Sequence, residues 1–185
     1  MKILMPLAEG FEEIEALTVV DILRRAEINV VVAGLKEGII EGAHEIKVQP
    51  DTCLEKINFS DYDGLVLPGG FPGFVNLKND ERILTMVREM DSAGKYVAAI
   101  CAAPSVLIKA GITKGRRATV SPSGKEEMKA SAQYSEDRVV VDKNLITSQS
   151  PGTAMEFALK LVEVMAGEDA MKKVKAQTLA ICKGD

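Results

Sequence analysis

The chain has 185 residues, a formal net charge of −4 and a pI near 5.2. This balance excludes the broadly basic face that nucleic-acid binding needs, so no nucleic-acid partner is expected. No apolar run approaches the roughly 20 residues that span a bilayer, and the run from Ile3 to Leu7 is too short for a secretory signal, so we expect a cytoplasmic protein without a membrane partner.

Short apolar runs alternate with helical patterns along the whole chain. Strands are expected at Lys2–Leu7, Asn29–Ala33, Gly64–Leu67, Tyr96–Ile100 and Arg117–Val120. Helices are expected at Glu12–Ala26, Glu81–Met90, Pro104–Ala110, Lys125–Lys129, Gly152–Met165 and Glu168–Lys175. Turn residues inside two further apolar segments predict hairpins over Gly38–Val48 and Arg138–Thr147.

This alternation predicts an α/β fold with a mostly parallel sheet, helices on both faces and two hairpin insertions. With 46% hydrophobic residues and no linker or repeat, residues 1–185 are expected to form one domain. Sites in such sheets lie at the carboxyl ends of the strands. Three segments should therefore share one crevice: Ala8–Gly10, Pro68–Gly73 and Cys101–Pro104.

The chain carries three widely spaced cysteines, Cys53, Cys101 and Cys182, and a single histidine, His44. A structural zinc site needs about four clustered ligands of these types, so no metal is expected. Sparse, odd-numbered cysteines without a signal sequence are typical of a reducing compartment. Cys53 lies in a loop-like context and Cys182 in the tail, and we interpret both as structural residues.

Cys101 directly follows an apolar strand and precedes a helix, with small alanines on both sides. Its position resembles the nucleophile elbow of hydrolases in shape, although alanines stand where that elbow has glycines. A helix N-terminus favours the thiolate and lowers the pKa of a thiol, so we expect a reactive cysteine. A buried, inert cysteine is the alternative.

Glu15 falls on the apolar stripe of its predicted helix, among Val19 and Ile22, whereas Glu13 falls on the solvent face. Burial would raise the pKa of the Glu15 carboxyl, which could then donate a hydrogen bond to a thiolate or act as a base. The alternative is that Glu15 tips into solvent near the helix start, where acidic residues are favoured.

The segment Pro68–Gly73 is not a dinucleotide-binding loop, because its glycine spacing is wrong and Phe71-Pro72 would not open a helix with free N–H groups. Its glycines could turn backbone N–H groups into the crevice as an oxyanion hole. A plain turn is equally consistent with the residues.

Taken together, four motifs in this order resemble the DJ-1/ThiJ/PfpI superfamily, and within it the branch of the Parkinson-linked deglycase. The resemblance covers nearly the whole chain, and its carriers are Glu12-Glu13-Ile14-Glu15, Leu67-Pro68-Gly69-Gly70, Ala98-Ala99-Ile100-Cys101-Ala102-Ala103-Pro104, and Ser150-Pro151-Gly152-Thr153 leading into Glu156-Phe157-Ala158. It implies a flavodoxin-like three-layer sandwich and a homodimer. It also implies that Cys101 is the reactive cysteine, that Glu15 is a protonated carboxyl beside it, and that the N–H groups of Gly70 and Ala102, next to Gly69, bind an oxyanion.

The sequence departs from the family pattern in two places. Ser121 stands where the family has its pocket histidine, and a hydroxyl cannot buffer protons near neutral pH as imidazole can. Residue 102 is alanine where the protease-like branch has histidine, so peptidase activity is not expected. His44 lies where the family often has an arginine that reaches the dimer-related pocket, and Arg25 matches another family arginine. We therefore include both in the pocket, with His44 as a hypothetical substitute base.

Three functions are consistent with these residues. The first is cofactor-free chemistry on a small aldehyde or ketoaldehyde such as methylglyoxal, of the glyoxalase or deglycase type, with Cys101 as nucleophile and Glu15 as proton shuttle. The second is a non-catalytic redox sensor or stress-response protein, with or without a chaperone role, in which Cys101 is oxidised to sulfinate. The third, a glutamine-amidotransferase-like hydrolase or peptidase, requires a histidine in a triad with cysteine and glutamate.

Overall fold

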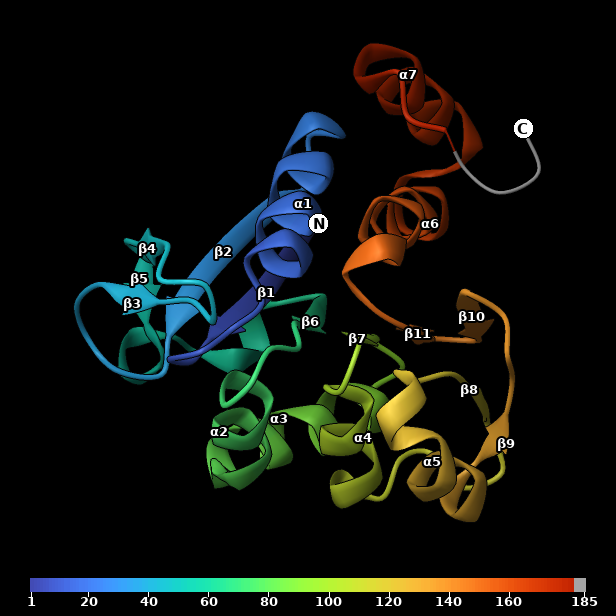
Figure 1. Ribbon diagram of the computed structural model, residues 1–185. Helices are drawn as coiled ribbons and strands as arrows, with labels where there is room; N and C mark the ends of the chain where they lie inside the picture. The colour runs from blue at the N-terminus through green and yellow to red at the C-terminus, as the bar shows by residue number, and fades with distance from the viewer. Residues whose placement is uncertain (182–185) are drawn as a thin grey trace.

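A seven-stranded sheet forms the centre of the computed structural model, which describes residues 1–181 (Figure 1). Its strands lie in the order β10, β11, β7, β6, β1, β2, β5. Their bounds are β1 Lys2–Leu7, β2 Asn29–Gly34, β5 Thr52–Cys53, β6 Gly64–Leu67, β7 Tyr96–Ile100, β10 Val139–Asp142 and β11 Leu145–Ser148. All neighbours pair in parallel except β10, which is antiparallel to β11, so the predicted sheet and the second hairpin are confirmed.

Helices cover both faces of this sheet, as Figure 1 shows. One face carries α1 (Glu13–Arg25) and α6 (Ala154–Ala166), with α7 (Glu168–Thr178) packed on α6. The other carries α2 (Gly73–Asn79), α3 (Glu81–Ser92) and α4 (Pro104–Ala110), and α5 (Lys125–Ser131) packs beside α4. The three-layer architecture predicted from the sequence is confirmed.

The sequence pattern of β1 explains why both faces must be covered. Ile3, Met5 and Leu7 belong to the core cluster under α1 and α6, whereas Leu4 belongs to the cluster under α3 and α4. Successive side chains of a strand point to opposite faces, so an unbroken apolar run needs a helix layer on each side.

Two small sheets lie outside the central one. The strands β3 (Ile40–Glu41) and β4 (Lys47–Val48) form the predicted first hairpin, with Ile40 opposite Val48. The strand expected at 117–120 is shorter, because β8 (Arg117–Ala118) pairs only with β9 (Gln133–Tyr134). Within the described residues, no helix is both long and apolar enough to cross a membrane.

Helix α2 was not among the helices expected from the sequence, which indicated only that Phe71-Pro72 would not open a helix with free N–H groups. The helix begins at Gly73, immediately after this proline. Its first N–H groups are already used: Gly73 donates to the carbonyl of Gly10 at 3.1 Å and Phe74 donates to that of Gly70 at 2.8 Å. The helix start thereby ties the end of β6 to the end of β1.

Candidate active site around Cys101

Cys101 occupies a strained backbone position at the carboxyl end of β7. Its φ is +64°, in the left-handed region that residues with a Cβ rarely adopt. The backbone is held there from two sides: its N–H donates to the carbonyl of Ser148 at 3.1 Å, and its carbonyl accepts from the N–H of Ser121 at 2.8 Å. A cysteine in this conformation forms the sharp strand-to-helix turn that the sequence indicated, with α4 beginning three residues later.

Glu15 is fully buried in α1, at 0% exposure, which excludes the alternative that it tips into solvent. Its Oε2 atom accepts a hydrogen bond from the N–H of Gly69 at 2.8 Å. Its Oε1 atom is buried and has no hydrogen-bond partner in the described chain. The Oε2 atom therefore fixes the side chain, and the Oε1 atom remains available for a further hydrogen bond.

Gly69 separates this carboxylate from the thiol. A Cβ added at this glycine would lie 2.7 Å from Oε2 of Glu15, 2.7 Å from Cβ of Cys101 and 3.2 Å from its Sγ. No side chain fits at position 69 without displacing one of the two. The glycine thus allows a residue from α1 and a residue after β7 to face each other across the end of β6.

Burial, the largest effect, raises the pKa of Glu15 from 4.5 to about 7, and the charge of Glu12 acts in the same direction. The hydrogen bonds from Gly69 and Cys101 oppose this rise. The carboxyl therefore titrates near neutral pH.

The pKa of Cys101 is raised to about 12, which is opposite to the direction expected from the sequence. Burial is the largest cause of this rise, followed by the charge and the hydrogen bond of Glu15. A hydrogen bond from the N–H of Ala102 opposes the rise and lowers the pKa of the thiol. Helix α4 has only seven residues, so its dipole is small. Because two of the raising effects come from Glu15, the thiol and the carboxyl titrate as a coupled pair.

The remaining predicted oxyanion residue, Gly70, also needs to be a glycine. Its φ is +92°, and an added Cβ would lie 2.2 Å from the backbone nitrogen of Glu12. Its N–H donates no hydrogen bond within the described residues. Ser121 is 6% exposed, and its hydroxyl lies 3.1 Å from that of Ser123, so it supports the backbone of Cys101 but supplies no imidazole-like base.

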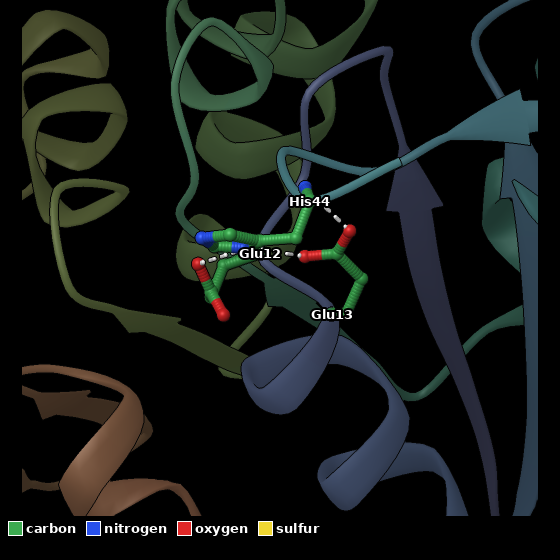
Figure 2. Close-up of side chains that lie close together, drawn as sticks. All are labelled: Glu12, Glu13 and His44. Carbon is green, nitrogen blue, oxygen red and sulfur yellow. Dashed lines mark hydrogen bonds and ion pairs between the residues drawn. The ribbon is translucent and has the colours of Figure 1, made fainter. Parts of the chain in front are cut away.

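His44 and Arg25 are not brought to the thiol within this chain. Nδ1 of His44 faces the carboxylates of Glu13 and Glu12, at 2.9 and 3.6 Å, and the ring is exposed (Figure 2). No cysteine–histidine–glutamate triad forms among residues 1–181. Arg25 lies in the last turn of α1 and pairs with Asp21 at 2.9 Å, with half of its side chain exposed.

The sequence pattern missed the burial of Glu12 and Glu13. Glu13 was expected on the solvent face of α1, but it is only 4% exposed because the β3–β4 hairpin covers it. Glu12 is 9% exposed, and its charge raises the pKa of both Glu15 and Cys101. Helical periodicity could not reveal either, since the β3–β4 hairpin covers Glu13 and Glu12 precedes the first residue of the helix.

The three segments predicted to share one crevice do meet. The N–H of Glu12, which follows Ala8–Gly10, donates to the carbonyl of Gly69 at 3.0 Å, and Gly69 contacts Cys101. A surface cavity of about 340 Å³ lies further along the same edge, between the ends of β1 and β2, and its lining does not include Cys101. Cys53 is a buried thiol in β5, and Cys182 lies outside the described residues.

Comparison with known proteins agrees with the family resemblance found in the sequence. The model of the DJ-1/PfpI family matches residues 1–164. A protein of Pyrococcus abyssi named a deglycase is 36% identical over 167 residues, covering 89% of this chain and 99% of the relative. The crystal structure of Drosophila melanogaster DJ-1beta superposes with a TM-score of 0.94 at 41% identity, covering 98% of each chain. The structure of oxidized Toxoplasma gondii DJ-1 gives a TM-score of 0.93 at 36% identity, covering 98% of this chain and 99% of that chain.

Proposed function

The chain belongs to the DJ-1/PfpI family, and we propose that it acts on small reactive carbonyls through Cys101 and Glu15 without a cofactor. The substrate is a small aldehyde or ketoaldehyde such as methylglyoxal. The observation that carries the proposal is the placement of a thiol and a buried carboxyl against the same glycine, Gly69. The name of the Pyrococcus abyssi relative, a deglycase, supports the substrate class.

The reactive form of the site is the singly ionised pair, in which Cys101 is a thiolate and Glu15 carries the proton. This arrangement has the same net charge as a thiol beside a carboxylate, so the two interconvert by moving one proton. Burial is the largest cause of the raised pKa of the Cys101 thiol, and the negative charge of ionised Glu15 raises it further, so a second ionisation of the pair is disfavoured. The hydrogen bond from the N–H of Ala102 favours the thiolate form.

With methylglyoxal, the thiolate of Cys101 adds to the aldehyde carbon, and the carbonyl oxygen takes the proton to give a hemithioacetal. The N–H groups of Gly70 and Ala102 stabilise the negative oxygen while it forms. Glu15 removes the proton from the former aldehyde carbon and returns it to the neighbouring carbon, which converts the hemithioacetal into a lactoyl thioester. Water cleaves the thioester, so that one methylglyoxal and one water give one lactate and the free thiol. No oxidant or reductant is needed.

The experiment that tests this function is lactate formation from methylglyoxal by the native chain and by Cys101→Ser. We expect the serine variant to form no lactate, since its hydroxyl ionises far less readily than a thiol. Cys53→Ser is the matched control, because Cys53 is buried in β5 away from Glu15, and it should keep the native rate. Lactate formation that survives in Cys101→Ser would rule the mechanism out.

A second candidate function is redox sensing, in which Cys101 is oxidised to sulfinate beside Glu15. Two observations favour it. The described chain has no histidine base near the thiol, and a sensor needs none. The similar Toxoplasma gondii DJ-1 has been solved as an oxidized protein. The free Oε1 atom of Glu15, when protonated, is a suitable donor to a sulfinate oxygen.

We also propose that the chain forms a homodimer through α1 and the β3–β4 hairpin. Four large apolar side chains are exposed there: Ile14 at 56%, Leu17 at 38%, Ile39 at 55% and Ile46 at 51%. Exposed apolar residues that gather on one surface are typical of protein interfaces. For the compartment we propose the cytoplasm, which the two free thiols at Cys53 and Cys101 support.

A further inference from the structure

The carboxyl end of β11 contacts the Cys101 turn directly and also holds a second segment beside it. The carbonyl of Ser148, the last residue of β11, accepts the N–H of Cys101 at 3.1 Å. The residues before and after Ser148 both bind Thr119. The N–H of Thr119 donates to Oγ1 of Thr147 at 2.9 Å, and Nε2 of Gln149 donates to Oγ1 of Thr119 at 3.2 Å. Alternate residues of an extended chain point the same way, which lets both side chains reach one partner.

Residues 119–121 depend on these side chains because no strand pairing joins them to the central sheet. They follow β8, which runs beside β10 and β11 but pairs only with β9 (Figure 1). The N–H of Thr119 therefore donates to the side-chain oxygen of Thr147 and not to a backbone carbonyl of a neighbouring strand. Thr119 and Thr147 are both at 0% exposure, so solvent does not compete for this bond.

The held segment returns to the cysteine. Two residues after Thr119, the N–H of Ser121 donates to the carbonyl of Cys101 at 2.8 Å. The hydrogen bonds and the intervening backbone thus close a ring that includes both the N–H and the carbonyl of Cys101. The φ of Cys101 is +64°, a conformation that is unfavourable for a residue with a Cβ and persists only where its surroundings hold it.

We propose that Thr147 is a positioning residue, whose buried hydroxyl keeps Cys101 in the left-handed conformation in which its thiol faces Glu15. The proposal rests on the proposed function, in which the thiol and the carboxyl act as a pair. The two groups meet across Gly69, where an added Cβ would lie 3.2 Å from Sγ and 2.7 Å from Oε2. A change of φ to the usual negative range moves the Cβ of Cys101 and carries the thiol away from this contact.

The hydroxyl of Thr147 is the one link of the ring that a substitution of nearly unchanged shape removes. Thr147→Val replaces the hydroxyl by a methyl group, so the N–H of Thr119 loses its acceptor in a fully buried position. A buried N–H without a partner is strongly disfavoured, so residues 119–121 must shift until it finds one. This shift withdraws the N–H of Ser121 from Cys101, which then relaxes to a negative φ.

The crystal structure of Thr147→Val is the first test. We expect a negative φ at Cys101 and no hydrogen bond from the N–H of Ser121 to its carbonyl. If Thr147→Val does not fold, Ser121→Pro breaks the same ring at its last bond, at a residue whose φ of −55° suits proline. A φ that stays near +64° in the variant would overturn the proposal, whatever reaction the protein catalyses.

The second test follows the alkylation of Cys101 by iodoacetamide as a function of pH, with the modified peptide measured by mass spectrometry. In the native chain we expect the rate to rise around pH 7, where the Glu15 carboxyl titrates and the singly ionised pair forms. In Thr147→Val the thiol leaves the carboxyl, so the rise should move up by about 1.5 pH units, to the free-thiol value of about 8.5. A rise that stays near pH 7 in Thr147→Val would contradict the positioning role.

Two control variants separate positioning from a general loss of stability. Thr147→Ser keeps the hydroxyl and should keep the rise near pH 7. Thr113→Val removes a hydroxyl that is 2% exposed and donates to the carbonyl of Ser131 at 3.4 Å, beyond the far end of α4, and it should also keep the native profile. A shifted profile in either control would overturn the proposal. Absence of the rise in the native chain would instead refute the Cys101–Glu15 pair of the proposed function, and the crystal structure then decides the role of Thr147 by itself.

Discussion

Gly69→Ala tests the central geometric claim, that Glu15 and Cys101 can face each other only because the residue between them has no side chain. The added methyl group would lie 2.7 Å from Oε2 of Glu15 and 2.7 Å from Cβ of Cys101. Ordinary contacts begin near 3.4 Å, so these atoms must move apart by about 0.7 Å. Gly69 does not have a left-handed φ, so alanine is compatible with the backbone and only the lack of space is tested.

Overpacking of this kind costs about 1–3 kcal/mol. For a chain of this size, each kcal/mol lowers Tm by about 2–4 °C. We also expect lactate formation to fall by about 100-fold, because a misplacement near 1 Å has this effect on positioned groups. Thermal unfolding and the methylglyoxal assay measure the two effects separately.

Gly152→Ala is the control for Gly69→Ala. Gly152 also lacks a left-handed φ, but a Cβ there meets no atom within 4 Å. Alanine at this position should be neutral or should stabilise the chain by up to about 1 kcal/mol, because it lowers the conformational entropy of the unfolded chain. If Gly69→Ala matched Gly152→Ala in both Tm and lactate formation, the claim that Gly69 keeps the carboxyl and the thiol in contact would be refuted.

Three further predictions concern Glu15, Cys101 and Ile14. The pKa of Glu15 is raised from 4.5 to about 7, so the folded chain keeps a proton that the unfolded chain loses between these values. The free energy of unfolding should therefore fall by about 3 kcal/mol as the pH rises from 4.5 to 7, relative to Glu15→Gln. Urea unfolding measures it at each pH, and the same pH dependence in the native chain and in Glu15→Gln would contradict the prediction. Under mild peroxide, mass spectrometry should find two added oxygens on Cys101 and none on Cys53, which is 4% exposed; equal oxidation of both would count against a sensor. Ile14→Asp should shift the chain from dimer to monomer in sedimentation, whereas Glu27→Gln should not, and a monomeric native chain would exclude the proposed interface.

Local sequence patterns determined the layers of the fold and marked Glu15 and Cys101 as candidate site residues, each with a plain structural alternative. An apolar run without polar alternation, as in Lys2–Leu7, specifies a strand buried on both faces, because adjacent side chains point in opposite directions. The helical spacing of Glu15 with Val19 and Ile22 likewise favours burial, and the structure decides for it, with Glu15 at 0% exposure. Cys101 was recognisable because a strand, a cysteine and a helix start follow one another in the sequence.

Only the tertiary structure decided what surrounds these residues. The pKa of Cys101 is raised rather than lowered, because burial and the facing Glu15 outweigh the N–H of Ala102. Gly69 stands between thiol and carboxyl because β6 lies between β1 and β7 in the sheet, an order that no local pattern encodes. Glu13 is buried by a hairpin that brings His44 against it. Periodicity reports which side of an element faces the core, whereas charge environments and hydrogen-bond partners depend on which elements the fold places side by side.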